Sequence, residues 1–266
     1  MGPVSRIHAF EWNDTEATPV FIRESIVELL GRGLRWGNIY VAVAPLFAKL
    51  LERVKAREVL DLATGSGEPC SIVIRAFEES GIEPPRFALS DLFPNVEAMK
   101  IIEARHPGKI EVIEKSVDAT AVPAEADRPV RTIWSAFHHL TPELARRILA
   151  DSVAKKRAIF VVEAFPRRLH RLLPVLLWCA ISAVLNPFLA KKQRILKLIF
   201  TLIPVIPLLG LWDAIVSVLR IHSAEELRAM VARLDGSYVW EFHEIPYGLI
   251  GRATVFLGLP GQGSTG

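Results

Sequence analysis

The sequence predicts an α/β fold built on a seven-stranded, mostly parallel sheet. Three observations lead to this expectation. Short β-prone runs alternate with helical stretches from about residue 57 onward, the first of these runs ends in a glycine-rich turn, and no helix separates the last two runs. Alternation of this kind indicates βαβ units with right-handed crossovers, whereas the last two strands can pair antiparallel at the sheet edge.

Each expected element follows from a local pattern of residues. The β-prone runs are rich in branched and aromatic side chains, and they cover residues 58–63, 86–90, 110–113, 130–135, 157–162, 238–242 and 253–257. The helical stretches begin at caps or early prolines and end near glycines, and they cover residues 18–30, 41–54, 68–80, 95–104, 141–153 and 223–235. Together they predict a Rossmann-like domain with helices in front of it.

Length and composition limit the class of protein. The chain has 266 residues, of which 51% are hydrophobic and 23% are charged, so it can bury a core and is not disordered throughout. Cys70 and Cys179 are too few and too far apart for a disulfide scaffold or a zinc finger, and we expect no metal site. The N-terminus lacks an apolar signal core, so we expect a cytoplasmic protein.

The same patterns divide the chain into segments. We expect an N-terminal helical element over residues 1–56, a Rossmann-like domain over 57–165 and 222–259, an inserted apolar and basic cap over 166–221, and a flexible tail over 260–266. The insertion combines eight basic residues with a single acid, Asp213. It therefore differs sharply from the rest of the chain.

The ends of the first three strands carry the cofactor signal. The first strand runs into Asp61-Leu62-Ala63-Thr64-Gly65-Ser66-Gly67, Asp91 follows the second strand, and Asp118-Ala119 follows the third. In an open parallel sheet the ligand binds at the carboxyl ends of the strands, where glycines allow close approach of the backbone. A carboxylate at Asp91 can accept both ribose hydroxyls, and Asp118 can accept from an adenine amino group. Cys70 replaces the third glycine of a dinucleotide fingerprint, which favours an adenosine cofactor without a pyrophosphate.

At these motifs the sequence resembles class I S-adenosylmethionine-dependent methyltransferases over about residues 37–165 and 223–259. The motifs are Val59 to Gly67, Leu89-Ser90-Asp91, Val117-Asp118-Ala119-Thr120, and Trp134 to Leu140. Ala63 replaces the first glycine of the family loop. Asp91-Leu92-Phe93-Pro94-Asn95, Asn186-Pro187-Phe188 and Leu211 to Arg220 resemble a narrower bacterial group of methyltransferase-like proteins of unassigned substrate.

The resemblance implies S-adenosylmethionine as cofactor and assigns roles to the matching residues. Asp61 and the Gly65–Gly67 loop would face the methionine part, Asp91 the ribose and Asp118 the adenine, while Ser135 would lie near the sulfonium. Tyr40 belongs to a leading segment that could close over the cofactor. The full set of expected cofactor residues is Tyr40, Asp61, Ala63, Gly65, Gly67, Asp91, Leu92, Asp118, Ala119 and Ser135.

Three side chains are candidates for the catalytic site. His138 and His139 follow the fourth strand, and histidine can accept a proton near neutral pH. Either histidine could instead only pack or cap the next helix. Asp213 could act in the acceptor site or form a structural pair with Arg220 two helical turns later. Glu163, at the end of the fifth strand, could orient an acceptor or pair with Arg167 or Arg168.

The apolar insertion leaves several interpretations open. Its apolar runs, over 172–185 and 198–212, contain or adjoin prolines and are shorter than the roughly 20 residues of a membrane span. They could form a lid over a hydrophobic acceptor pocket, lie in an anionic membrane interface on the inner face, or make an ordinary cap with a solvated basic rim. Basic residues interleaved with bulky aliphatics argue against nucleic acid.

We therefore expect methyl transfer from S-adenosylmethionine to a small, hydrophobic or lipid-like acceptor. Two alternatives belong to other classes. One is a membrane-interface binding protein with a non-catalytic methyltransferase fold, and the other is an NAD-dependent oxidoreductase.

Overall fold

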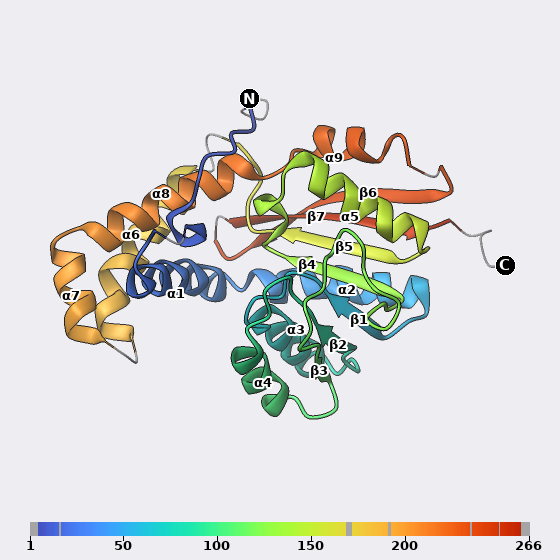
Figure 1. Ribbon diagram of the computed structural model, residues 1–266, viewed down its shortest axis with the longest axis horizontal. Coiled ribbons are helices and arrows are strands. Elements are labelled where there is room, and N and C mark those ends of the chain that lie inside the picture. The colour runs from blue at the N-terminus through green and yellow to red at the C-terminus, as the bar shows by residue number, and fades with distance from the viewer. Residues whose placement is uncertain are drawn as a thin grey trace. The chain divides into compact units, whose positions relative to one another are not determined.

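The computed structural model describes residues 5–15, 17–168, 172–190, 193–234, 236–249 and 251–261 (Figure 1). Within these ranges the chain forms one seven-stranded sheet in the order β3-β2-β1-β4-β5-β7-β6. The strands are β1 (Glu58–Asp61), β2 (Arg86–Leu89), β3 (Ile110–Val112), β4 (Val130–Trp134), β5 (Ala158–Glu163), β6 (Tyr238–Tyr247) and β7 (Gly251–Pro260). This confirms the predicted α/β fold.

The sheet is parallel except at one edge. β1 pairs in parallel with β2 and β4, β2 with β3, and β4 with β5, whereas β7 runs antiparallel to β5. Every residue of β4 and β5 is buried, as expected of central parallel strands with both faces covered. The strand order reverses between β1 and β4. A sheet of this type binds its ligand outside the carboxyl ends of the strands at that reversal.

The last two strands are longer than the sequence pattern predicts. Each has 10 residues, and β6 continues through the polar His243-Glu244 pair to Tyr247. The residues of β6 from Trp240 to Ile245 are only half-buried, so they do not show the apolar pattern of a central strand. Pairing at the sheet edge, where a proline such as Pro246 is tolerated, extends the strand beyond its β-prone core.

Helices surround the sheet: α2 (Ile39–Val54), α3 (Glu68–Glu79), α4 (Val96–Arg105), α5 (Pro142–Ala154) and α9 (Ala224–Val231). An aromatic cluster joins α2 to the sheet. The ring of Phe47 lies 5.0 Å from that of Phe160 and 5.6 Å from that of Trp134. Another core cluster contains Leu60, Ile133 and Ile159 of the sheet and Leu149 of α5. These clusters fix the strand ends that carry the candidate site.

The chain separates into two compact units. One contains Met1–Ile39, Ala164–Ser223 and Pro246–Arg252, and the other contains Tyr40–Glu163, Ala224–Ile245 and Ala253–Gly266. We call them the helical unit and the sheet unit. The division differs from the expected segments, because the element expected over residues 1–56 is shared between the two units. Its first helix, α1 (Val20–Trp36), packs with the insertion, whereas the aromatic cluster holds α2 on the sheet.

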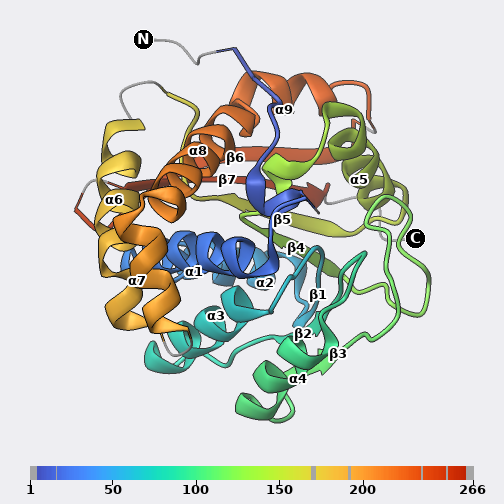
Figure 2. The same ribbon diagram turned by 60° about the vertical axis from the view of Figure 1, so that its left-hand side comes forward.

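The helical unit consists mainly of α1 and the insertion helices α6 (Leu172–Leu189), α7 (Arg194–Leu202) and α8 (Val205–Arg220). Figure 2 shows these four helices side by side, and each of α1, α6 and α8 contacts the other two. Their shared core includes Leu29, Val175, Ile206 and Val218. Lys191 and Lys192, expected on the basic rim, and residues 262–266 of the expected flexible tail lie outside the described residues.

Taken one at a time, none of the described helices has the length and hydropathy of a membrane span. The α7–α8 pair has both jointly, by length and composition alone, with a 78° bend between the two helices.

Candidate cofactor and catalytic site

The turn after β1 is formed largely by backbone. Ala63, Gly65 and Gly67 all have positive φ values, of 52°, 57° and 78°. A Cβ atom added at Gly67 would lie 2.6 Å from Cδ1 of Leu89, whereas one added at Gly65 would meet no heavy atom within 4 Å. Gly67 thus has a conformation that favours glycine and lies close against Leu89, whereas Gly65 leaves the turn open.

Hydrogen bonds join the turn to the end of β2. The backbone N–H of Gly65 donates to Asp91 Oδ2 at 3.0 Å, and the N–H of Thr64 donates to the Ser90 carbonyl at 3.0 Å. The other Asp91 oxygen accepts the N–H of Phe93 at 3.0 Å. Asp91 itself is half-buried and Leu92 is exposed. The carboxylate therefore lies directly beside the bare backbone of the glycine turn.

The segment after β3 reaches the same edge of the sheet. The N–H of Val117 donates to the Asp91 carbonyl at 2.9 Å, which places Asp118 and Ala119 next to the β2 loop. Asp118 is exposed, and its Oδ1 accepts the N–H of Thr120 at 2.8 Å. That backbone bond lowers the pKa of Asp118, so its carboxylate is ionised at neutral pH. The structure thus brings Asp61, Asp91 and Asp118 to one edge, as the sequence predicts.

Asp61, the last residue of β1, is a buried carboxylate held by two hydroxyls. Thr64 Oγ1 donates to one oxygen at 2.5 Å and Thr132 Oγ1 to the other at 2.6 Å. Burial raises the pKa of Asp61 to about 6, although both hydroxyl donors act to lower it. The sequence analysis did not identify Thr132. Its signal is a hydroxyl within the buried strand β4, which neighbours β1.

Ser135 and Tyr40 meet beyond the end of β4. Ser135 follows β4 with φ of 51°, a strained value for a residue that is not glycine, and its Oγ lies 3.2 Å from the Tyr40 hydroxyl. The Tyr40 ring packs edge-on against Trp134 at 5.8 Å. Burial raises the pKa of Tyr40, so the phenol stays protonated and can donate to Ser135. Both predicted residues therefore lie at the strand reversal.

His138 is bound at two points by Glu163. Glu163 Oε1 accepts the backbone N–H of His138 at 2.8 Å, and Oε2 lies 2.7 Å from Nδ1 of the ring. Both residues are buried, His138 in the short helix η2 (Phe137–His139) and Glu163 at the end of β5. A carboxylate at Nδ1 holds the ring proton there and makes Nε2 the basic nitrogen. Glu163 thus contacts His138, a partner that the sequence analysis did not propose.

His139 lies against His138 and is half-buried. The centroids of the two rings are 4.2 Å apart. The Glu163 contact orients the His138 ring, and the catalytic role of His139 stays a prediction.

Asp213 belongs to the helical unit, where it binds the N-terminal segment. Its carboxylate accepts the backbone N–H groups of Trp12 and Asn13 at 2.8 and 3.0 Å and the Asn13 side-chain amide at 3.2 Å. Arg220, its expected partner, instead binds Glu11 at 3.0 Å and Asp14 at 2.9 Å. The Asp213–Arg220 pair is therefore replaced by two separate contacts to the segment around η1 (Trp12–Asp14). A catalytic role for Asp213 stays a prediction.

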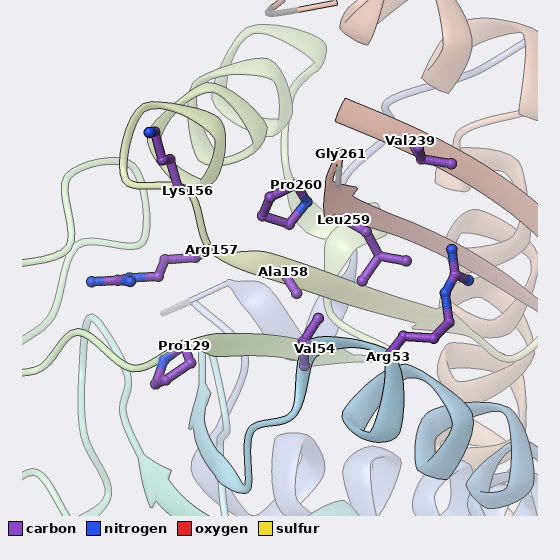
Figure 3. A pocket seen from close by; sticks show the side chains of 10 residues that line it. All are labelled: Arg53, Val54, Pro129, Lys156, Arg157, Ala158, Val239, Leu259, Pro260 and Gly261. Atoms are coloured by element: carbon purple, nitrogen blue, oxygen red, sulfur yellow. The ribbon is translucent and has the colours of Figure 1, made fainter. Parts of the chain in front are cut away.

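A pocket of about 310 Å³ lies at the amino ends of β4 and β5 (Figure 3). Pro129 and Ala158 mark those strand ends, and the pocket also contains three basic residues, Arg53, Lys156 and Arg157. Arg53 pairs with Glu241 and Arg157 with Asp127. The pocket is thus on the opposite edge of the sheet from the three carboxylates, and it is not the predicted cofactor site.

Comparisons with solved structures identify the fold. The plantazolicin methyltransferase BpumL in complex with SAH has a TM-score of 0.58 at 10% identity, with 94% of each chain covered. The pyocyanin biosynthetic protein PhzM has a TM-score of 0.50 at 14% identity, with 84% of this chain and 56% of PhzM covered. An O-methyltransferase family protein from Burkholderia thailandensis has a TM-score of 0.46 at 17% identity, with 84% of this chain and 58% of that protein covered.

The strand order and the likeness to BpumL and PhzM together show the fold of a class I S-adenosylmethionine-dependent methyltransferase. The chain spans little more than half the length of PhzM and of the Burkholderia protein. No protein-family model and no curated protein matches the sequence. Neither the oxidoreductase nor the non-catalytic alternative gains support from the similar structures.

Proposed function

We propose that the protein transfers a methyl group from S-adenosylmethionine to a small, hydrophobic or lipid-like acceptor. One observation carries the proposal. The Gly65 N–H binds Asp91 beside a bare turn, and Asp61 and Asp118 flank that turn at the same sheet edge. This arrangement offers carboxylates for ribose and adenine next to backbone that a polar ligand can approach.

The residues present fit this cofactor. Asp91 has a half-buried carboxylate for the ribose hydroxyls, and the exposed, ionised Asp118 can accept from the adenine amino group. Asp61 and the Gly65–Gly67 loop suit the methionine part, with Ser135 and Tyr40 near the sulfonium. Cys70, fully buried in α3, fills the position of a third glycine and disfavours a pyrophosphate. BpumL, which shares the fold, was solved with SAH.

The His138–Glu163 pair supplies a general base for an oxygen or nitrogen acceptor. When bound, S-adenosylmethionine would supply an electrophilic methyl carbon for the acceptor lone pair, with its sulfur as the leaving group. His138 Nε2 takes the proton released by the acceptor, and Glu163 stabilises the resulting imidazolium through Nδ1. The protein otherwise contributes alignment of the acceptor and exclusion of water.

The composition of the chain supports a hydrophobic acceptor. Residues 166–221, which follow Glu163 almost directly, include α6, in which no residue is charged. The apolar composition of this segment favours a substrate with little polar surface of its own. The acceptor atom is not specified by these residues.

Calorimetry with S-adenosylmethionine, S-adenosylhomocysteine and NAD tests the cofactor assignment. We expect the two adenosyl compounds to bind and NAD not to bind. Asp91→Ala should weaken adenosyl binding about 10- to 100-fold, as expected for losing hydrogen bonds to a charged group. Glu97→Ala, an exposed acid on α4, is the matched control and should bind normally.

A labelled-methyl assay over lipids, quinols and aromatic metabolites tests the reaction. Transfer to an apolar acceptor, lost in His138→Ala, supports the proposal. Adenosyl binding without transfer to any acceptor would remove the enzymatic assignment, and absence of adenosyl binding would remove the cofactor assignment as well.

A further inference from the structure

Two helices of the helical unit, α6 and α7, expose bulky apolar side chains on their outer face and bury small or polar groups. On α6 the exposed residues include Leu173, Leu177, Ile181, Val184 and Phe188, which follow one another at intervals of three or four. That spacing places them on one face of the helix. Leu173 is 74% exposed and Phe188 is 66% exposed.

The opposite face of α6 carries small and polar side chains. Cys179, Ser182, Ala183 and Asn186 are buried there, beside Val175. Ser182 Oγ donates to the Leu29 carbonyl of α1 at 2.8 Å. Soluble helices normally bury their largest apolar residues, whereas helices in lipid place small and polar residues at helix–helix contacts.

α7 repeats this reversal with a lysine. Lys197 is its buried residue, and its ammonium group binds Glu28 of α1. The other side of the helix exposes Ile195, Ile199 and Leu202, with Ile195 78% and Leu202 75% exposed. Exposing these side chains to water forgoes the free energy of burying them unless an apolar medium covers the outer face.

A polar network links the three helices from within. Glu28 binds both Lys197 and Arg32, and Arg32 Nη1 donates to Asn186 Oδ1 at 3.0 Å. The charges of Glu28, Arg32 and Lys197 are therefore paired inside the unit, and the aliphatic face can enter an apolar medium.

The charges on these helices favour an anionic surface. α6 and α7 contain no acid, and the acid of α8, Asp213, is buried against the N-terminal segment. Arg194 is exposed at the start of α7, beside Lys191 and Lys192 in the sequence. Cations next to an apolar face are the pattern of helices that bind the headgroup region of anionic bilayers.

We propose that the outer faces of α6 and α7 dock into the interface of an anionic lipid bilayer, such as the cytoplasmic leaflet. The aliphatic stripe would enter the acyl boundary and Arg194 would meet the headgroups. This goes beyond the proposed methyl transfer and does not depend on it.

Vesicle flotation of the full chain tests the proposal. We expect the protein to float with phosphatidylcholine vesicles that contain about a third phosphatidylglycerol, and less with phosphatidylcholine alone. The double variant Ile195→Ser with Leu202→Ser should weaken this binding at least about tenfold, because each lost side chain removes apolar burial. Its thermal stability should not fall, since both positions are exposed.

The matched control is Ile82→Ser with Ile101→Ser, which changes two exposed isoleucines of the sheet unit. It should float like the unchanged protein. Equal flotation of both double variants would overturn the proposal. Concentration-dependent dimers in sedimentation velocity, abolished by the α7 variant and unaccompanied by vesicle binding, would assign the face to a second copy instead. Calorimetry with S-adenosylmethionine on the same samples separates this outcome from a failure of the proposed function.

Discussion

Glu163 holds both the backbone and the ring of His138, through Oε1 at 2.8 Å and Oε2 at 2.7 Å. One carboxylate thus fixes the position of the residue and the proton on its ring. Because Trp134 of β4 pairs with Val162 of β5, the loop after β4 and the end of β5 are neighbours in the sheet. The pair is therefore built from two adjacent strand ends.

Replacing Glu163 with Gln should preserve the backbone contact but present an amide to Nδ1. The ring would then favour the wrong tautomer, and we expect kcat for methyl transfer to fall about 10²- to 10⁴-fold. Binding of S-adenosylmethionine should change little, which calorimetry can check. Glu143→Gln, an exposed change on α5, serves as the control. An unchanged kcat in Glu163→Gln would exclude His138 as the general base.

Gly67→Ala should destabilise the protein more than Gly81→Ala. Both glycines have positive φ, so both changes carry a backbone cost of about 1–2 kcal/mol. Only at Gly67 would the new methyl group meet Leu89, at 2.6 Å, whereas nothing lies within 4 Å at Gly81. We expect an additional loss of about 1 kcal/mol in the free energy of unfolding, measured in urea. Equal losses would show that Leu89 yields without cost.

Asp61 should make stability depend on pH. Its folded pKa is about 6, above the ordinary value of 3.8, so the folded state binds the proton more tightly than the unfolded state. The stabilisation from protonation is complete below about pH 4 and is lost as the pH rises through 6. Relative to Asp61→Asn, the unchanged protein should lose on the order of 3 kcal/mol across this window. Urea unfolding of both proteins at several pH values measures the difference, and parallel curves would contradict the prediction.

Asp213→Ala should loosen the N-terminal segment. The change leaves the N–H groups of Trp12 and Asn13 without this acceptor, at a cost of about 1–3 kcal/mol. We expect faster amide hydrogen exchange over residues 12–14, with an intermediate effect for Asp213→Asn. Methyl-transfer kinetics of the same variants separate the two roles. A kcat loss without faster exchange would favour the predicted catalytic role over anchoring.

The shared position of the expected cofactor residues was predictable because the carboxyl ends of parallel strands meet at one edge. Asp61, Asp91 and Asp118 each follow a β-prone run, so the topology alone places them together. Glu163 was identified as a strand end, but its contact with His138 depends on the lateral order of β4 and β5. The partner of Arg220 could not be predicted for the same reason. Spacing along one helix suggested Asp213 as its partner, whereas the folded chain places Glu11 beside it.

The sequence by itself determined the alternation of strands and helices, the strand that ends in the glycine turn, and the carboxylates that follow successive strands. These features depend on local patterns of residues, which each segment carries wherever it is placed. Only the tertiary structure decided that α1 packs with the insertion helices and not with α2. It also decided that Glu163 orients His138, and that the aliphatic sides of α6 and α7 face outward. Those outcomes depend on which distant segments compete for the same buried surface, and no single segment encodes that choice.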